Sequence, residues 1–262
     1  MFAATHAQAR TNRFARTTTD GRHIWRSRYF GPPPSPESSS SLMPALSETV
    51  YVDRLPGEPR EPQAFLIEQD PGATVHPHFH FVDQFQVVAA GSGSLGRHKL
   101  APLSVHFAAA CTGYGPIEPG AEGLSYFTFR ASADETGAQY LPAARNRMRP
   151  GRRRNEIVDQ IPLTPPDALR QRTNSQLDTA LELDDGLAVC LYRLAPGASA
   201  HAIDASLGDG VTLMVAAGSL QQDDGMFPRW SCLFVPPEEA RLPLRAGPDG
   251  AEVLMLRYPK KR

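Results

Sequence analysis

One pentapeptide occurs twice in this chain of 262 residues and restricts the folds open to it. Val-Ala-Ala-Gly-Ser stands at residues 88–92 and again at 215–219. Each copy is preceded by Pro-Gly-Ala, at 71–73 and at 196–198. Two identical landmarks in the same order indicate that one structural unit is present twice. The second interval is slightly longer, which predicts a small hairpin insertion near residues 208–210.

Two further pairs of apolar runs support the repeat. Residues 103–107 pair with 230–234, and the terminal runs 124–130 and 253–258 pair with each other. Each copy consists of short runs rich in Val, Leu, Phe and Tyr, separated by Gly, Pro and Asp turns. This pattern, without a long helical period, is typical of an all-β sandwich or barrel. We therefore expect an all-β protein in which one sandwich or barrel occurs twice in tandem.

Three histidines, His76, His78 and His80, occupy every second position of a short run in the first copy. Alternate residues of a β-strand face the same side, so the three imidazoles would converge if this run is a strand. Imidazole groups at this spacing are suitable ligands for a borderline divalent metal ion. The run is therefore a candidate metal site.

Glycines frame the histidine run at fixed distances. The framed pattern reads Gly72, five residues, His78 and His80, three residues, Gln84, six residues and Gly91. It resembles the first signature of the cupin superfamily, except that Gln84 stands where that signature has a Glu. The resemblance covers most of residues 44–260 and implies double-stranded β-helix barrels of the jelly-roll type. With the internal repeat, it implies a bicupin whose specific motif is confined to the first barrel.

The resemblance also implies one bound divalent metal ion, which could be Fe, Ni, Mn, Cu or Zn. The expected ligands are His78, His80, Gln84 and His76. An alternative ligand set consists of two histidines and one carboxylate, His76, His78 and Asp83. This choice breaks the six-residue spacing to Gly91. A purely structural metal with closed coordination remains a further alternative.

Three more residues are expected beside the metal, in a ligand pocket: Gln86, Tyr114 and His106. Strand alternation puts Gln86 on the same face as Gln84. Tyr114 falls where the second cupin motif would supply a histidine, so it is either a ligand or a packed residue at the rim. His106 lies in an apolar run and corresponds to Leu233 in the second copy, which favours a cavity histidine.

The second copy lacks this set of polar residues. The residues that correspond to His76, His78, His80 and Gln84 are His201, Ile203, Ala205 and Val211. We expect a degenerate barrel there, with a structural role or an apolar pocket, and His201 at its surface or in that pocket.

Composition predicts the domain boundaries. Residues 1–42 are rich in Arg, Thr, Ala and Ser and poor in acids, which predicts a disordered extension or a start site assigned too far upstream. The first barrel is expected over residues 43–132 and the degenerate barrel over 176–262. Residues 133–175, with the basic run 145–154, are expected to form a linker with a short helix.

Charge and cysteine content bear on partners and location. The net charge of −1 gives no reason to expect nucleic acid or an anionic membrane as a partner, and no apolar stretch is long enough to span a bilayer. Cys111, Cys190 and Cys232 form no motif, which favours a reducing, cytoplasmic location without disulfides. A homodimer is an option only by analogy with cupins that pair through edge strands.

These observations favour a cupin-type metal-binding protein that acts on a small organic molecule as a metal-dependent dioxygenase or isomerase. The alternative is a non-catalytic small-molecule-binding or sensor cupin. The absence of the signature Glu and of the second-motif histidine favours that alternative.

Overall fold

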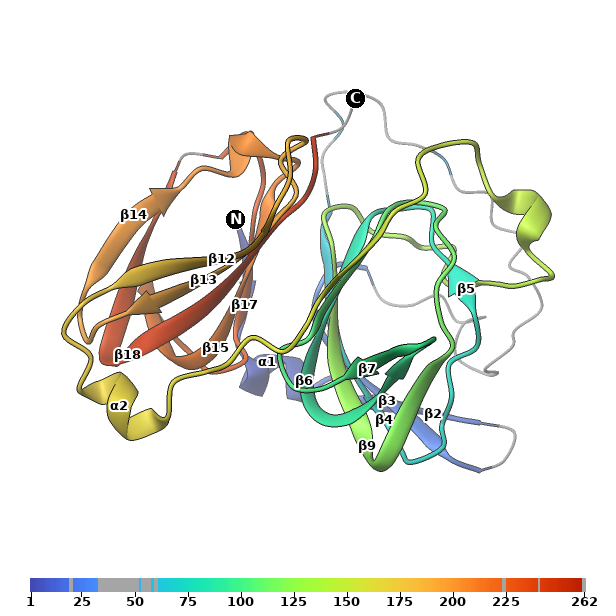
Figure 1. Cartoon of the computed structure of the whole chain (residues 1–262), viewed down its shortest axis with the longest axis horizontal. Helices are drawn as coiled ribbons and strands as arrows, with labels where there is room; N and C mark the ends of the chain where they lie inside the picture. Colours follow the sequence, from blue (N-terminus) through green and yellow to red (C-terminus); the bar gives the residue numbers. More distant parts are fainter. Residues whose placement is uncertain are drawn as a thin grey trace. The chain divides into compact units, whose positions relative to one another are not determined.

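The computed structural model describes residues 1–18, 21–32, 52, 58, 61–222, 225–239 and 241–260 (Figure 1). The chain divides into two compact units. The first unit is Thr11–Ile161, and the second combines Met1–Arg10 with Pro162–Arg262. Nearly all regular structure is antiparallel β-sheet, as the pattern of short apolar runs predicts.

The first unit is built on a sheet that has eight strands within the described residues, in the order β11-β8-β6-β9-β4-β3-β2, with β7 paired to β6. Its strands are β2 (Phe14–Thr17), β3 (His23–Phe30), β4 (Gln63–Gln69), β6 (Gln84–Leu95), β7 (His98–Leu100), β8 (Val105–Ala108), β9 (Ile117–Arg130) and β11 (Asn155–Val158). A separate two-stranded ladder joins β5 (His78–Phe79) to β10 (Gln139–Tyr140). A single 3₁₀ turn, η2 (Arg145–Arg147), follows it.

The second unit repeats this arrangement. Within the described residues its sheet also has eight strands, in the order β1-β17-β15-β18-β13-β12, with β14 paired to β18 and β16 to β15. The strands are β1 (Phe2–Ala4), β12 (Gln176–Glu182), β13 (Ala188–Leu194), β14 (Ser199–Ile203), β15 (Val211–Gln222), β16 (Gly225–Pro228), β17 (Cys232–Val235) and β18 (Leu242–Arg257). The short helices are α1 (His6–Arg10), α2 (Pro166–Arg170) and the 3₁₀ turn η3 (Ala205–Leu207).

The repeated pentapeptide forms the same β-bulge in both units. The register of β6 against β9 shifts between Val88 and Ala90, and the register of β15 against β18 shifts between Val215 and Ala217. A bulge inserts one residue and bends the strand, which helps a sheet to close around a core. The sequence repeat therefore corresponds to a repeat in strand register.

The glycine of each pentapeptide is required by a close crossing of two strands. Gly91 and Gly218 have φ angles of +76° and +67°. A Cβ atom at Gly91 would lie 2.2 Å from the carbonyl oxygen of Gly123, and one at Gly218 would lie 2.0 Å from that of Gly250. Only glycine combines this backbone conformation with so close an approach.

In each sheet, at least one edge strand comes from a segment that composition places outside the barrels. β1 pairs with β17 in the second unit, and β11 pairs with β8 in the first. The first unit also includes β2 and β3, so the structure differs from the expectation that residues 1–42 lack structure. The reason is that β3 pairs with β4 and buries Ile24, Ser27 and Tyr29 between its arginines, a feature that overall composition hides. Residues 33–42 lie outside the described residues.

The unit boundaries also differ from those predicted. The first unit runs to Ile161 and includes β10 and β11, whereas the sequence places residues 133–175 in a linker. Part of the basic run packs on this unit, since the guanidinium carbons of Arg149 and Arg154 lie 5.3 and 5.1 Å from the ring centres of Phe81 and Phe107. The short helix expected in the linker is α2, which belongs to the second unit.

The two barrels have different interiors. The core of the second unit consists of aliphatic side chains and includes Ile203, Ala205 and Val211, the residues that correspond to His78, His80 and Gln84. The core of the first unit has apolar residues such as Ile67 and Leu124 but also two tyrosines, Tyr114 and Tyr126. At the positions that correspond to His78, His80 and Gln84, the second unit therefore has apolar core residues where the first unit has buried polar side chains.

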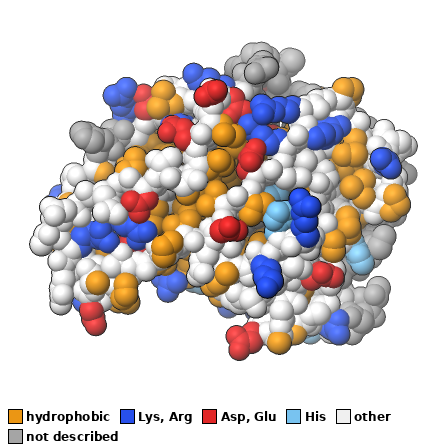
Figure 2. All heavy atoms as spheres, viewed as in Figure 1, with side chains coloured by type: hydrophobic (Ala, Val, Ile, Leu, Met, Phe, Trp, Pro, Cys, Tyr) orange, Lys and Arg blue, Asp and Glu red, His pale blue; other side chains and the backbone are white. Residues whose placement is uncertain are grey.

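The surface agrees with the near-neutral composition. On the face shown in Figure 2, basic and acidic side chains are interspersed. The three cysteines are free and buried. Among the described residues, the helices are all too short to cross a membrane.

Candidate functional site

Strand register gathers polar side chains on the interior face of the first barrel. Directly paired residues of antiparallel strands share a face. Gln86 of β6 is paired with Thr128 of β9 and with His106 of β8. Gln63 of β4 is paired with Arg130 of β9. The polar side chains on this face are Arg26, Gln63, Gln84, Gln86, His106, Tyr126, Thr128 and Arg130.

His78 and His80 lie together at one end of this face. Both are buried, and their ring centroids are 5.3 Å apart. Nδ1 of His78 lies 2.7 Å from the carbonyl oxygen of His76, and Nδ1 of His80 lies 3.0 Å from Oδ2 of Asp134. Both partners accept hydrogen bonds, so each Nδ1 carries the proton and each Nε2 carries the lone pair. This is the tautomer that a metal-bound histidine adopts.

His76 does not share the buried face of His78 and His80, contrary to the expectation of three converging imidazoles. Its side chain is exposed. Isolated bridges hold the chain at Val75 and at His78, and Pro77 forms a bend between them. Because the chain bends there, the alternation of side chains between the two faces of a strand does not continue back to His76.

Arg130 lies between the expected ligands. Its Nη2 donates to Oε1 of Gln84 at 3.0 Å and lies 3.0 Å from Nε2 of His80. Its Nε also donates to Gln84, at 3.2 Å, and its Nη1 donates to Gln63 at 2.5 Å. The lone pairs of His80 and Gln84 that would bind a cation are therefore already engaged with a positively charged group.

The donor set as built does not fit a divalent metal ion. A fixed guanidinium charge among the ligand atoms repels a metal cation and competes for the same lone pairs. Among the described residues there is no group of three or more His, Cys, Asp or Glu side chains arranged to hold a metal. The carboxylate of the alternative register, Asp83, accepts a hydrogen bond from the backbone of Ala110 at 2.8 Å, and His76 is exposed.

Tyr114 lies against the histidine pair. Its ring centroid is 4.5 Å from that of His78 and 5.0 Å from that of His106. The amide nitrogen of Gln84 donates to the Tyr114 hydroxyl. Burial raises the pKa of Tyr114, so the phenol stays protonated at neutral pH and is not an anionic ligand. The structure therefore brings Tyr114 into contact with two expected ligands.

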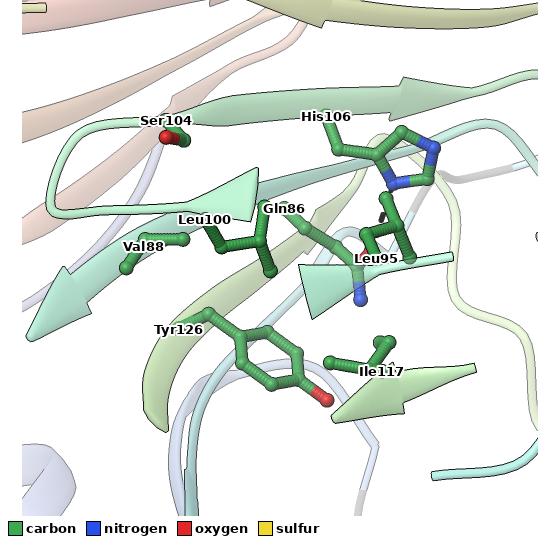
Figure 3. Close-up of a pocket in the computed structure, with 8 residues that line it drawn as sticks. All are labelled: Gln86, Val88, Leu95, Leu100, Ser104, His106, Ile117 and Tyr126. Atoms are coloured by element: carbon green, nitrogen blue, oxygen red, sulfur yellow. Dashed lines mark hydrogen bonds between the residues drawn. The ribbon is translucent and has the colours of Figure 1, made fainter. Parts of the chain in front are cut away.

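Gln86 and His106 line a small cavity beyond this cluster (Figure 3). Nδ1 of His106 lies 2.9 Å from Oε1 of Gln86, and its Nε2 lies 3.0 Å from Oδ1 of Asn155. The amide nitrogen of Gln86 and the hydroxyl of Tyr126 point into the same space in Figure 3. The remaining walls are mainly apolar: Val88, Leu95, Leu100, Ser104 and Ile117.

The cavity is small. The space open to the centre of a water-sized sphere is about 10 Å³, roughly the room that one water molecule needs. The surrounding open volume, which includes solvent at the mouth, is about 250 Å³. Pockets for drug-sized ligands begin at about 300 Å³, and the enclosed part of this cavity is far smaller, so a ligand larger than water requires the lining side chains to move.

The three buried histidines are neutral near pH 7. Burial lowers the pKa of His78 to about 3, with a further contribution from His80. Burial and the charge of Arg130 lower the pKa of His80 to about 4, and burial lowers that of His106 to about 4. Burial acts to raise the pKa of Asp134, but the hydrogen bond from His80 and the charge of Arg130 outweigh it and hold that pKa below its usual range.

Two residues of this cluster, Arg130 and Asp134, are absent from the sequence-based prediction. Arg130 ends an apolar run, and strict alternation from Tyr126 through Thr128 would have placed it on the interior face. Asp134 falls in the predicted linker, and no local pattern marks it. The side chain of His201 lies outside the described part of the chain.

The chain was compared with known proteins. No protein-family model and no curated protein matches it. Among solved structures, it is similar to a protein from Nostoc punctiforme PCC 73102 that carries a provisional dioxygenase name, with 12% identity, a TM-score of 0.56, and coverage of 95% of this chain and 79% of that one.

Two other solved structures are also similar. One is a bacterial pirin from Escherichia coli in complex with nickel(II), at 14% identity and a TM-score of 0.50, covering 95% of this chain and all of the pirin. The other is oxalate decarboxylase from Bacillus subtilis, described with Mn(II) centres, at 13% identity and a TM-score of 0.53, covering 96% and 77% of the chains.

These neighbours are cupin-family proteins, and they share the all-β barrel fold of this chain. At 12 to 14% identity the likeness shows the fold alone. The sequence-based prediction of an all-β jelly-roll protein is confirmed.

Proposed function

We propose that the first barrel is a binding site for a small molecule and that its own side chains, rather than a resident metal ion, form the polar contacts. The observation that carries this proposal is the guanidinium of Arg130 between His80 and Gln84. A cation built into the fold supplies the positive charge that a metal would otherwise bring.

The polar groups around the cavity suit recognition of a compact polar ligand. Gln86 offers an amide and Tyr126 a hydroxyl, while apolar side chains form most of the other walls. Ligand sites usually combine a few polar groups with mainly apolar walls. This agrees with the alternative drawn from the sequence, a non-catalytic small-molecule-binding or sensor cupin.

A metal-dependent dioxygenase or isomerase is the second candidate. The tautomers of His78 and His80, each fixed through Nδ1, favour it, because both Nε2 atoms are left as potential ligands. The nickel and manganese named for two structural neighbours agree with it. The guanidinium of Arg130 would have to leave His80 and Gln84 for these residues to coordinate a metal.

Metal content distinguishes the two candidates. The protein would be purified without an affinity tag, incubated with Fe, Ni, Mn, Cu or Zn in turn, desalted and analysed for bound metal. We expect no stoichiometric metal in the wild-type protein. Arg130→Met, which frees the lone pairs of His80 and Gln84, is expected to bind more metal than the wild type.

The matched control is the double variant His78→Ala, His80→Ala. Near-stoichiometric metal in the wild type that disappears in this variant would overturn the first candidate and establish the second. A screen of small metabolites by thermal shift of the metal-free protein then tests ligand binding directly.

A further inference from the structure

The Arg26 guanidinium stands on the interior face of the first barrel with no hydrogen-bond or ion-pair partner among the described residues. Arg26 is paired with Ile67, and Ile67 with Tyr126, so Arg26 shares a face with this cavity residue. Arg26 as a whole is half-buried but its Nε atom is fully buried, and among the residues that the structure describes its side chain makes no hydrogen bond or ion pair. Buried charged groups are normally paired, since desolvation of an unpaired charge is costly.

A second guanidinium lies beside the same ring. The guanidinium carbons of Arg26 and Arg130 are 5.1 and 5.4 Å from the ring centre of Phe65. Burial lowers the pKa of Arg26, and the charge of Arg130 adds to that effect. Arg16 belongs to the same group, because burial and the charge of Arg26 lower its pKa to about 9.

The nearby carboxylate, Asp134, makes no hydrogen bond to these arginines among the described residues. Asp134 accepts hydrogen bonds from Nδ1 of His80, from the backbone of Phe81 at 3.2 Å, and from the backbone and hydroxyl of Thr136 at 3.0 and 2.6 Å. Its two oxygens are therefore occupied by groups other than the arginines. The described interior of the first barrel consequently has an excess of positive charge.

The second unit shows how this chain accommodates a buried arginine with a structural role. Arg193 donates from Nη1 to Glu252 at 2.5 Å and from Nε to Asp178 at 2.6 Å. Both partners are carboxylates, and the guanidinium is satisfied by the fold. Among the described residues Arg26 has no comparable pair of acceptors, so its guanidinium is available to a ligand.

We propose that the first barrel binds the acidic group of a small molecule, a carboxylate or a phosphate, through Arg26, with Arg130 as the second cation. A guanidinium matches the geometry of both oxyanions through two parallel hydrogen bonds. The amide of Gln86 and the hydroxyl of Tyr126 supply further donors at the cavity. This inference rests on the proposed ligand-binding function and adds the chemical class of the ligand.

The test is calorimetric titration of the full chain at constant ionic strength with malonate, with inorganic phosphate, and with malonamide as an uncharged counterpart of malonate. The variants are Arg26→Met, which removes the positive charge, and Arg26→Lys, which keeps the positive charge but lacks the planar guanidinium group. Arg13→Met is the control, because Arg13 belongs to the same unit but pairs with Glu68 and stacks on Trp25 instead of facing the interior group.

We expect malonate or phosphate to bind the wild type, and Arg26→Met to weaken that binding at least about tenfold. Arg26→Lys should show intermediate affinity and Arg13→Met the wild-type affinity. The unliganded Arg26→Met variant should melt no lower than the wild type, since it loses an unpaired charge. If that variant fails to fold, the Arg26→Lys titration decides, and unchanged affinity there would count against the inference.

Equal binding of malonate and malonamide, or wild-type anion affinity in Arg26→Met, would overturn the inference and leave the proposed ligand-binding function standing. Binding of neither oxyanion, together with no thermal shift from any neutral compound in the metabolite screen, would overturn both.

Discussion

Arg130 and His80 meet inside the first barrel, where Nη2 of the guanidinium lies 3.0 Å from Nε2 of the imidazole. The imidazole is held from its other side by Asp134, so it presents a lone pair to the arginine. A cationic residue thus stands where the sequence spacing predicts a metal cation. The same lone pair cannot serve both, and this competition underlies the proposed function.

Replacing Arg130 with Met is expected to destabilise the protein by about 2–4 kcal/mol. The change leaves buried acceptors on Gln63, Gln84 and His80 without their donor. Urea-induced unfolding monitored by circular dichroism measures the effect. A loss well below 1 kcal/mol would show that water satisfies these groups equally well.

Lowering the pH should destabilise the first barrel at pH values well above those at which its carboxylates titrate. His78, His80 and His106 have folded-state pKa values of about 3 to 4, below the ordinary value of 6.5. The unfolded chain therefore binds more protons in this window, and stability falls as the pH drops from 6.5 towards 4. Each histidine contributes a loss of about 2 kcal/mol between pH 7 and pH 5.

The histidine effect can be isolated by measuring unfolding free energies of His106→Gln across this pH range. The variant should lose about a third of the pH dependence that the three buried histidines give. The pKa of Asp134 lies below its usual range, so this carboxylate becomes protonated only at more acidic pH. Its protonation removes the hydrogen-bond acceptor of His80 and lowers the stability further. An unchanged pH dependence in His106→Gln would contradict the assignment.

Adding a methyl group at Gly91 or Gly218 should disrupt the bulged crossing in the corresponding barrel. Gly91→Ala places its Cβ 2.2 Å from a backbone oxygen that cannot move freely, with an expected cost of about 3 kcal/mol or more. Gly137→Ala is the matched control. Gly137 has a similar φ of +72° but no atom within 4 Å of the added carbon, so we expect a cost of about 1–2 kcal/mol. Thermal unfolding compares the two, and equal costs would show that strand crowding is unimportant.

Removing Glu252 should destabilise the second unit by about 3–5 kcal/mol, because Arg193 would lose a buried counter-charge. Glu252 is fully buried and also accepts hydrogen bonds from the backbone and hydroxyl of Thr164 at 2.9 and 2.5 Å. Glu252→Gln can be followed by denaturant unfolding. Arg241→Ala, which breaks an exposed pair with Asp204, is the control and should have little effect.

The sequence determined the architecture because its signals are local and repeated. The two copies of Val-Ala-Ala-Gly-Ser, at residues 88–92 and 215–219, specify a bulge and a glycine crossing wherever they occur. Short apolar runs between turn residues specify antiparallel strands with little reference to distant parts of the chain. Strand alternation in the same way placed Gln86 on the interior face with Gln84.

Only the tertiary structure decided what the first barrel offers a ligand. Arg130 meets His80 and Gln84 because β9 lies beside β6, a pairing of residues far apart in the chain. Asp134 reaches His80 from a segment without a recognisable motif, and the bend at Pro77 turns His76 to solvent. Such contacts depend on strand order and on a single bend, so no residue spacing along the chain encodes them. The sequence thus specifies the barrel, whereas side chains from separate strands determine the charge inside it.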